Sequence, residues 1–191
     1  MQDLINYNFE DNQNELVIIV NDKNEFQELQ TRKVMRKNNL WHRSTAILVF
    51  SKDEKNTFIY VHKRSKIKDY CPSYYSIGFG GVLSENENFL QNAIKELHEE
   101  SGIIKKPEQL FDLGLLKCET DCAKSYVTFI NPDFQTTPQL SEIEFITKIP
   151  LNDLDNFIEK EKMTGISKNV YHYFKDQIKK INLDQIYSMT I

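Results

Sequence analysis

The chain has 191 residues, of which 40% are hydrophobic and 27% charged, so it is long enough to bury one sizeable core and short for two. Its formal net charge of -4 supplies no broad basic field. This balance argues against a nucleic-acid polymer or an anionic membrane as the main partner. We therefore expect a single domain over residues 1–191.

The N-terminal residues MQDLINYNFEDNQNE are polar and acidic, rather than a basic start followed by an apolar run. No later apolar stretch approaches the length of a membrane span. The sequence therefore predicts a cytoplasmic protein. Residues 1–14 are rich in Asn, Asp and Gln, and we expect them to be mobile.

The chain contains three cysteines, Cys71, Cys118 and Cys122. Their number is odd, and Cys118 and Cys122 lack a second Cys or His pair at zinc-finger spacing. We expect all three to be reduced and to act as packing residues.

In the N-terminal half, runs of β-branched and aromatic residues predict strands at 16–20, 44–50 and 57–64. The polar SKDEKN between the last two predicts a hairpin. A short polar helix is predicted at 31–39. Residues 65–80 contain too many turn-forming residues for a helix and are predicted to form a loop.

The C-terminal half continues with three predicted strands, followed by two predicted helices. The strands are expected at 110–119, 125–132 and 142–150, and the helices at 152–161 and 167–180. Such a mixture of strands and helices is typical of a layered α/β domain.

Between the two halves, a helix is predicted from 88 to 101. Its apolar positions are spaced with helical periodicity, at 89, 90, 93, 94 and 97. Asn86 or Asn88 can cap its start, and Gly102 would end it. The helix therefore has well-marked ends.

Three carboxylates, Glu96, Glu99 and Glu100, lie in the second half of this helix, on one stripe at the edge of its apolar arc. Carboxylates about 6 Å apart repel by roughly 3 kcal/mol per pair at an effective dielectric near 20, and the negative pole of the helix adds to this cost. A solvated charged face is the ordinary reading of such a cluster. A divalent cation would make the arrangement favourable, and oxygen ligands without His or Cys suit Mg²⁺ or Mn²⁺ better than zinc.

The residues of this region carry a family resemblance. Gly81, five residues, Glu87, seven residues and then KELHEESGI resembles the Nudix box, Gx5Ex7REUxEExGU with U aliphatic. The box would occupy residues 81–103. Every defined position matches except Lys95, where the family has Arg.

The resemblance implies an α/β/α sandwich with a mixed central β-sheet. It also implies a metal-dependent hydrolase that cleaves a diphosphate linkage in a nucleoside-diphosphate-type or other organic diphosphate, with Mg²⁺ or Mn²⁺ as cofactor. The partner would be a small-molecule diphosphate. The oligomeric state stays open, a homodimer included.

The resemblance also implies roles for individual residues. Glu96 and Glu100 would be principal metal ligands, and Glu99 a further ligand or a base for water. Gly81 would let the backbone approach the metal, and Glu87 would be a loop carboxylate.

Lys95 is the departure from the family pattern. An ammonium is a mobile point charge, whereas a guanidinium is a rigid fork that can bind two carboxylates. Lys95 can neutralise Glu99 at i,i+4 but would orient it less well. A Nudix-fold binding module without catalysis is therefore an alternative, against which the presence of Glu96, Glu99 and Glu100 argues.

Binding charge for the substrate would come from a basic run, in which Arg64 is the preferred phosphate contact and Lys68 a second one. The other members of the run are Lys63 and Lys66. Gly80 is assigned to substrate binding beside the box. For each Lys alone, an ordinary basic residue at a strand end is as good an interpretation as a phosphate contact.

A narrower resemblance is to the subgroup that contains isopentenyl diphosphate isomerases and related hydrolases. True isomerases have a catalytic Cys followed by Gly-His-Pro, where this chain has Phe79-Gly80-Gly81-Val82. Only His42 resembles one of their metal-site histidines, so hydrolase is favoured over isomerase. Glu142 resembles an acidic position that follows the box in this subgroup and can face the site, although an exposed Glu opening a strand fits it equally.

Aromatic residues precede the box. Tyr74, Tyr75 and Phe79 can stack on a base or line a pocket, but aromatic residues at this density are at least as often core.

Overall fold

The computed structural model describes residues 13–180 and 186–188. Residues 1–12 of the segment predicted to be mobile lie outside the described residues. Eight strands form one sheet. They are β1 Leu16–Val20, β2 Phe26–Thr31, β3 His42–Lys52, β4 Thr57–Arg64, β5 Tyr75–Ile77, β6 Phe111–Cys118, β7 Asp121–Phe129 and β8 Ile143–Pro150.

The sheet is mixed. Its main path runs β2-β1-β3-β4-β5, with β8 paired to β4, and with β7 joining β3 to β6. The β3 and β7 strands are parallel, with His42 opposite Asp121 and Phe50 opposite Phe129, whereas the other pairs of strands are antiparallel.

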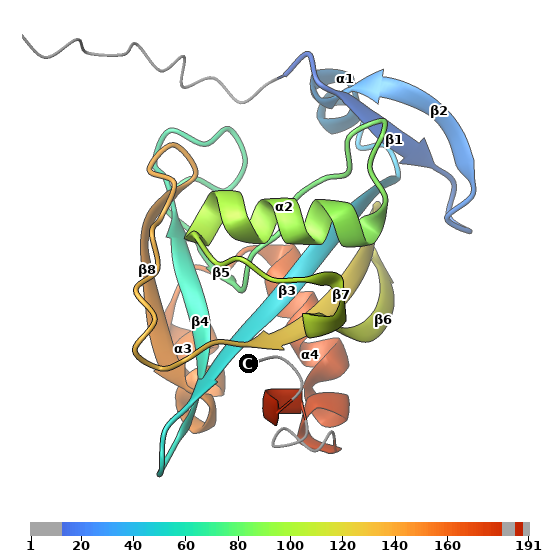
Figure 1. Cartoon of the computed structure of the whole chain (residues 1–191). Coiled ribbons are helices and arrows are strands. Elements are labelled where there is room, and N and C mark those ends of the chain that lie inside the picture. The colour runs from blue at the N-terminus through green and yellow to red at the C-terminus, as the bar shows by residue number, and fades with distance from the viewer. Residues whose placement is uncertain (1–12, 181–185, 189–191) are drawn as a thin grey trace, which may run out of the picture.

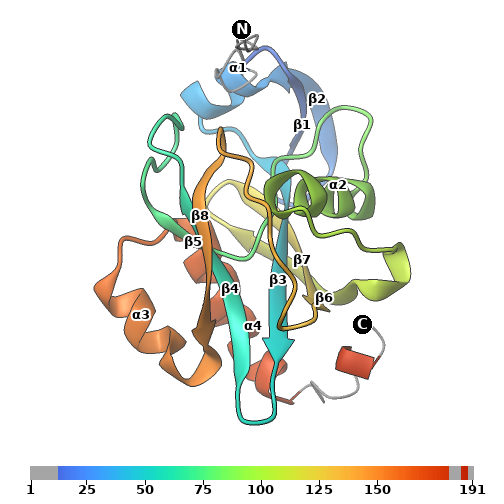
Figure 2. The ribbon, with the colours of Figure 1, turned by 60° about the vertical axis from the view of Figure 1, so that its left-hand side comes forward.

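Helices cover both faces of this sheet (Figure 1). They are α1 Arg32–Lys37, α2 Phe89–Ser101, α3 Leu154–Lys160 and α4 Gly165–Lys180, with 3-10 turns at Pro107–Gln109 and Leu151–Asp153. The α2 helix crosses one face, and α3 and α4 lie on the other (Figure 2). The predicted α/β/α sandwich with a mixed sheet is therefore confirmed. No helix of the described residues is long and apolar enough to span a membrane.

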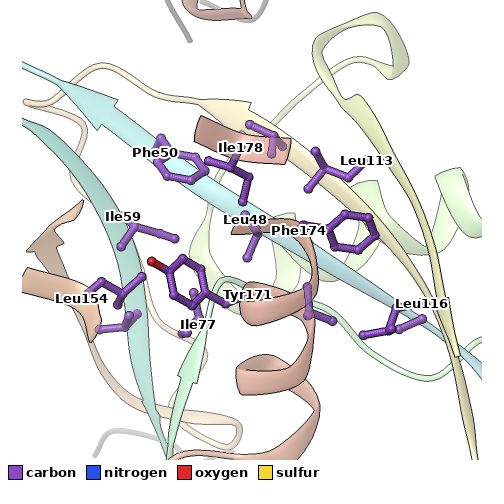
Figure 3. Packing of buried hydrophobic residues seen from close by; sticks show 14 of the residues in the cluster. Leu48, Phe50, Ile59, Ile77, Leu113, Leu116, Leu154, Tyr171, Phe174 and Ile178 are labelled. Atoms are coloured by element: carbon purple, nitrogen blue, oxygen red, sulfur yellow. The ribbon is translucent and has the colours of Figure 1, made fainter. Parts of the chain in front are cut away.

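Side chains along the central strands point alternately to the two faces of the sheet, so there is a hydrophobic core on each face. Leu48, Phe50 and Ile59 point toward α4, where they pack with Tyr171 and Phe174 (Figure 3). On the opposite face, residues of β3 and β4 pack with residues of α2, among them Ile47, Val49, Tyr60, Ala93 and Leu97. Because successive side chains of a strand point to opposite faces, one buried strand can serve both layers.

Most predicted elements are present, and two strands were missed. β2 has the sequence FQELQT, which is exposed or half-buried throughout and lacks the alternation that marks a strand. β5 lies inside the predicted loop 65–80, so that prediction is wrong for Tyr75–Ile77, which pairs with β4. A strand of three residues is too short to show a period. All three cysteines are free, and Cys122 is fully buried.

Candidate active site

The acidic helix α2 begins and ends at well-defined caps. The Asn88 side chain accepts from the Gln91 backbone N–H at 2.9 Å, and the Gln91 side chain accepts from the Asn88 N–H, which completes a capping box. At the other end, Gly102 has φ 74° and donates its N–H to the His98 carbonyl. Of the two predicted caps, Asn88 is the one used. The glutamates therefore lie in the last two turns of a helix that is capped at both ends.

A glycine loop, residues 78–81, faces these glutamates. The Gly80 N–H donates to Glu100 Oε2 at 3.0 Å. A Cβ on Gly81 would lie 2.6 Å from Cδ of Glu96, and one on Gly80 would lie 2.1 Å from the Thr45 carbonyl oxygen. Only glycine therefore lets this backbone fit between the strand and the carboxylates. The Gly81 carbonyl itself accepts from the Thr45 N–H at 2.9 Å.

Glu96 and Glu100 form an acidic pair, in which Glu100 is buried and Glu96 half-buried. Burial raises the pKa of Glu96 to about 7, and the Glu99 charge adds to this while Lys95 opposes it. Burial and the neighbouring Glu96 charge raise the pKa of Glu100 well above its usual range, against the Gly80 N–H and the Arg64 charge. The Glu96 charge thus raises the cost of ionising Glu100.

Glu99 differs from this pair in burial, because its side chain is exposed while Glu100 is buried, although its charge still acts on Glu96. In residues 13–180 and 186–188, no group of three or more His, Cys, Asp or Glu side chains is assembled in a geometry that could hold a metal ion. The predicted stripe of three carboxylates is therefore divided into the acidic pair and one solvent-facing member.

The partner of Lys95 differs from the predicted one. Lys95 Nζ donates to Glu87 Oε1 at 2.9 Å instead of pairing with Glu99 one turn on. Glu87 also accepts from the Ser84 N–H at 3.0 Å and from Asn92 Nδ2 at 2.8 Å. Burial opposes ionisation of Glu87, but these three donors, Lys95 first, hold its pKa below the usual value. Glu87 thus ties the loop before α2 to the first turns of the helix.

Asn92 was not singled out from the sequence. Its side chain is fully buried, and its Oδ1 accepts from Thr45 Oγ1 at 2.6 Å. Its Nδ2 donates to Glu87 and, at 3.3 Å, to the Val82 carbonyl. Asn92 therefore links α2, the loop and β3. Nothing in the sequence distinguishes it from the many other asparagines of this chain.

Three of the predicted binding and catalytic residues converge near Glu100. Arg64 donates through Nε to the Tyr70 carbonyl at 3.1 Å, and its charge acts on Glu100. Lys68 Nζ lies 2.6 Å from Glu142 Oε2, and the Glu142 charge raises the pKa of Glu100. Arg64 and Glu142 therefore act electrostatically on Glu100, and Lys68 is bound to Glu142.

Other predicted candidates lie elsewhere. Lys63 contacts Glu144 at 3.6 Å and the ring of Phe145 at 5.8 Å. Lys66 is exposed. The Tyr75 ring packs against Phe145 and against Phe157 of α3.

The surroundings of Phe79 and His42 indicate structural roles for both side chains. Phe79 is buried in the core beneath α2, so packing is its role. His42 Nδ1 donates to the Leu40 carbonyl at 2.9 Å, and its Nε2 lies 4.0 Å from Asp121. Tyr74 is half-buried.

The candidate site of this α/β/α sandwich thus consists of two helix carboxylates that face a glycine loop, with the charge of Arg64 acting on Glu100. Comparison with protein families matches residues 40–174 to the NUDIX domain, so the chain belongs to the Nudix family. The matched region contains the whole acidic site and begins after β1, β2 and α1.

Sequence relatives agree with this family. An uncharacterised Nudix hydrolase of Clostridium acetobutylicum is 26% identical over 146 residues, which cover 72% of this chain and 70% of that protein. The uncharacterised Nudix hydrolase YfcD of Escherichia coli K12 is 38% identical over 93 residues, which cover 49% of this chain and 50% of that protein. This second match thus spans half of each chain.

Solved structures agree with the fold. DR0079 from Deinococcus radiodurans has a TM-score of 0.68 at 15% identity, and the match covers 83% of this chain and 98% of that one. The NUDIX domain of Shewanella oneidensis NrtR, solved with ADP ribose, has a TM-score of 0.59 at 11% identity, with 78% and 99% covered. The prediction of a Nudix enzyme is confirmed at the level of the family. The two sequence relatives are named as hydrolases, and they do not support the narrower isomerase-like subgroup.

Proposed function

We propose that this Nudix protein is a metal-dependent hydrolase that cleaves the diphosphate linkage of a small organic diphosphate. The observation that carries the proposal is the acidic pair of Glu96 and Glu100 against the glycine loop, where the Gly80 N–H donates to Glu100 and a Cβ on Gly81 would meet the Glu96 carboxylate. The donor atoms around them are carboxylate oxygens, which suit Mg²⁺ or Mn²⁺. The cytoplasmic location inferred from the sequence belongs to the same proposal.

In this proposal, Glu96 and Glu100 hold the metal, and Gly81 leaves room for it beside the backbone. The metal, when bound, would neutralise charge that develops on the phosphoryl oxygens. Gly80 restricts the rotation of Glu100 through its N–H. Arg64 neutralises a substrate phosphate with the part of its guanidinium that Tyr70 does not use.

The proposal assigns proton transfer to exposed carboxylates. Glu99 faces solvent beside the pair and can accept a proton from the attacking water. Glu142 can do the same, but it is bound to Lys68 in this structure and would first have to exchange that partner. These two residues are therefore the candidate bases, and Glu99 is the more accessible.

The experiment is a substrate screen with purified protein and Mg²⁺. The panel would contain nucleotide sugars such as ADP-ribose, dinucleoside polyphosphates, nucleoside triphosphates and isoprenoid diphosphates, with product phosphates identified by ³¹P NMR. We expect one class to be cleaved within its diphosphate, and cleavage to stop with excess chelator. Turnover that persists without metal, or no turnover of any class, would contradict the proposal.

Lys95 provides a further prediction. Lys95→Ala is expected to lower hydrolysis by roughly tenfold, because it removes the cation that holds Glu87 and that offsets the negative charge beside Glu96. Lys95→Arg is expected to keep or raise the rate, since guanidinium can bind Glu87 with two parallel hydrogen bonds. Steady-state rates on the screened substrate measure both. Equal rates for Lys, Arg and Ala would show that this position does not organise the site.

A further inference from the structure

A buried histidine, His62, lies on β4 directly behind the glycine loop. Its side chain is 3% exposed, and its Nδ1 lies 2.8 Å from the Gly78 carbonyl oxygen. The ring stacks on Phe79 with centroids 5.4 Å apart and planes at 20°. The imidazole thus contacts both residues that precede Gly80.

The protonation state of His62 follows from these contacts. A carbonyl oxygen only accepts hydrogen bonds, so Nδ1 must carry the proton and donate it to Gly78. Nε2 is buried and has no hydrogen-bond partner among the described residues. Burial, reinforced by the Arg64 charge, lowers the pKa of His62 to about 3. The ring is therefore neutral at ordinary pH and unsuited to acid–base catalysis.

The loop that His62 contacts needs an external support. Gly78 and Gly80 have φ values of 72° and 144°, and glycines constrain the chain direction little by themselves. The β3 side holds Phe79 through two backbone hydrogen bonds with Ile47, of 2.7 and 3.0 Å. On the β4 side, the Gly78 N–H donates to the Tyr60 carbonyl at 2.9 Å, and His62 holds the Gly78 carbonyl.

Packing alone does not account for a histidine at this position. A buried polar atom without a partner is destabilising, and Nε2 is such an atom. A leucine would fill the same space without that cost. What a leucine cannot supply is the Nδ1–H donor to Gly78, two residues before the N–H that binds Glu100.

We propose that His62 is a positioning residue for the acidic pair: its Nδ1–H fixes the peptide unit after Gly78 and thereby aims the Gly80 N–H at Glu100. The consequence for hydrolysis rests on the function proposed above, whereas the consequence for the loop does not. His62 acts through the loop and touches neither substrate nor metal.

The first test uses the metal-free wild-type protein. Long-range ¹H–¹⁵N NMR is expected to show His62 as the neutral Nδ1–H tautomer throughout pH 5 to 9. A charged ring, or the Nε2–H tautomer, would overturn the assignment. This measurement needs neither substrate nor metal, so it stands even if the screen finds no hydrolysis.

The second test compares His62→Leu with His62→Asn, whose amide nitrogen can occupy the place of Nδ1. In the Leu variant, the Gly80 amide resonance should move away from its wild-type position, and Mn²⁺ affinity measured by EPR should fall about 10- to 100-fold. The Asn variant should recover the resonance and most of the affinity. For the substrate found in the screen, kcat should be highest in the wild type, lower in the Asn variant and lowest in the Leu variant, while KM changes little.

Several outcomes contradict the proposal. A Leu variant with a lower Tm but unchanged Gly80 resonance and Mn²⁺ affinity would show a purely structural role. An Asn variant as impaired as the Leu variant would show that the donor is not the cause. If the Leu variant does not fold, a Gly80 resonance in the Asn variant far from that of the wild type would equally exclude the donor. Normal Mn²⁺ binding without any hydrolysis would contradict the proposed function and leave the assignment of His62 intact.

Discussion

Glu100→Gln is expected to reduce Mg²⁺-dependent hydrolysis by at least about 10²-fold, the loss seen when one electrostatic stabiliser of a transition state is removed. The amide has nearly the same shape as the carboxylate, and its oxygen can still accept from the Gly80 N–H that now binds Glu100 at 3.0 Å. The change therefore removes charge and leaves the geometry in place. Glu96→Gln is expected to have an effect of the same order.

The control is Glu108→Gln, the same chemical change at an exposed glutamate in the Pro107–Gln109 turn. Initial rates would be measured across a Mg²⁺ titration, so that weaker metal binding is separated from slower turnover. Wild-type rates in both the Glu96 and Glu100 variants would rule out the metal-site assignment. Equal losses in the Glu108 variant would show that the effect is not specific to the pair.

Without metal, the same substitutions are expected to increase the stability of the folded protein slightly. Removing one of two neighbouring like charges relieves their repulsion and removes a negative charge from the negative pole of α2. A functional carboxylate pair should lower the stability of the metal-free protein and support hydrolysis when metal is bound. An ordinary cluster of surface glutamates should do neither.

The sequence predicted the α2 helix within one residue, together with its Gly102 cap, because both depend on local geometry that 3.6-residue periodicity and glycine positions encode. Arg64 was proposed for the site from the basic run that contains it, and Glu142 from the family resemblance. Their convergence on Glu100 depends on the pairing of β4 with β8, which no local pattern specifies.

The sequence did not predict contacts between segments that only the tertiary fold brings together. Lys95 was expected to pair with Glu99 along the helix, but the loop before α2 folds back and brings Glu87 closer. The sequence gives no sign of a role for His62, because its partner, Gly78, is adjacent only after β5 pairs with β4. Such partners depend on sheet register, and register is set by the whole core rather than by nearby residues.

Metal-free Glu96→Gln is expected to gain stability over the wild type as the pH rises from 4.5 to 7. Burial and the charge of Glu99 raise the pKa of Glu96 from 4.5 to about 7 in the folded protein. The folded state therefore holds this proton more tightly than the unfolded state, and the resulting stability is fully present below about pH 4.5. It is lost as the pH rises through 7.

A shift of this size corresponds to roughly 3 kcal/mol, or a change in Tm of roughly 6–12 °C for a chain of this length. The difference in Tm between variant and wild type is the quantity to measure, because other groups also titrate in this range, and His62 does so in the opposite sense. His62, with a pKa lowered to about 3, favours the folded state more as pH rises through 6.5. It contributes equally to both proteins and cancels in the difference.

Thermal unfolding of both proteins would be followed by circular dichroism between pH 4.5 and 8, with chelator and then with saturating Mg²⁺. With chelator, the Tm of the variant should rise relative to that of the wild type across this range. With Mg²⁺ at pH 8 the order should reverse, because a cation bound between ionised Glu96 and Glu100 stabilises only the protein that keeps both charges. A Tm difference that does not change with pH would mean that Glu96 ionises at an ordinary pKa, and the acidic pair would then not be the uncompensated charge on which the metal site depends.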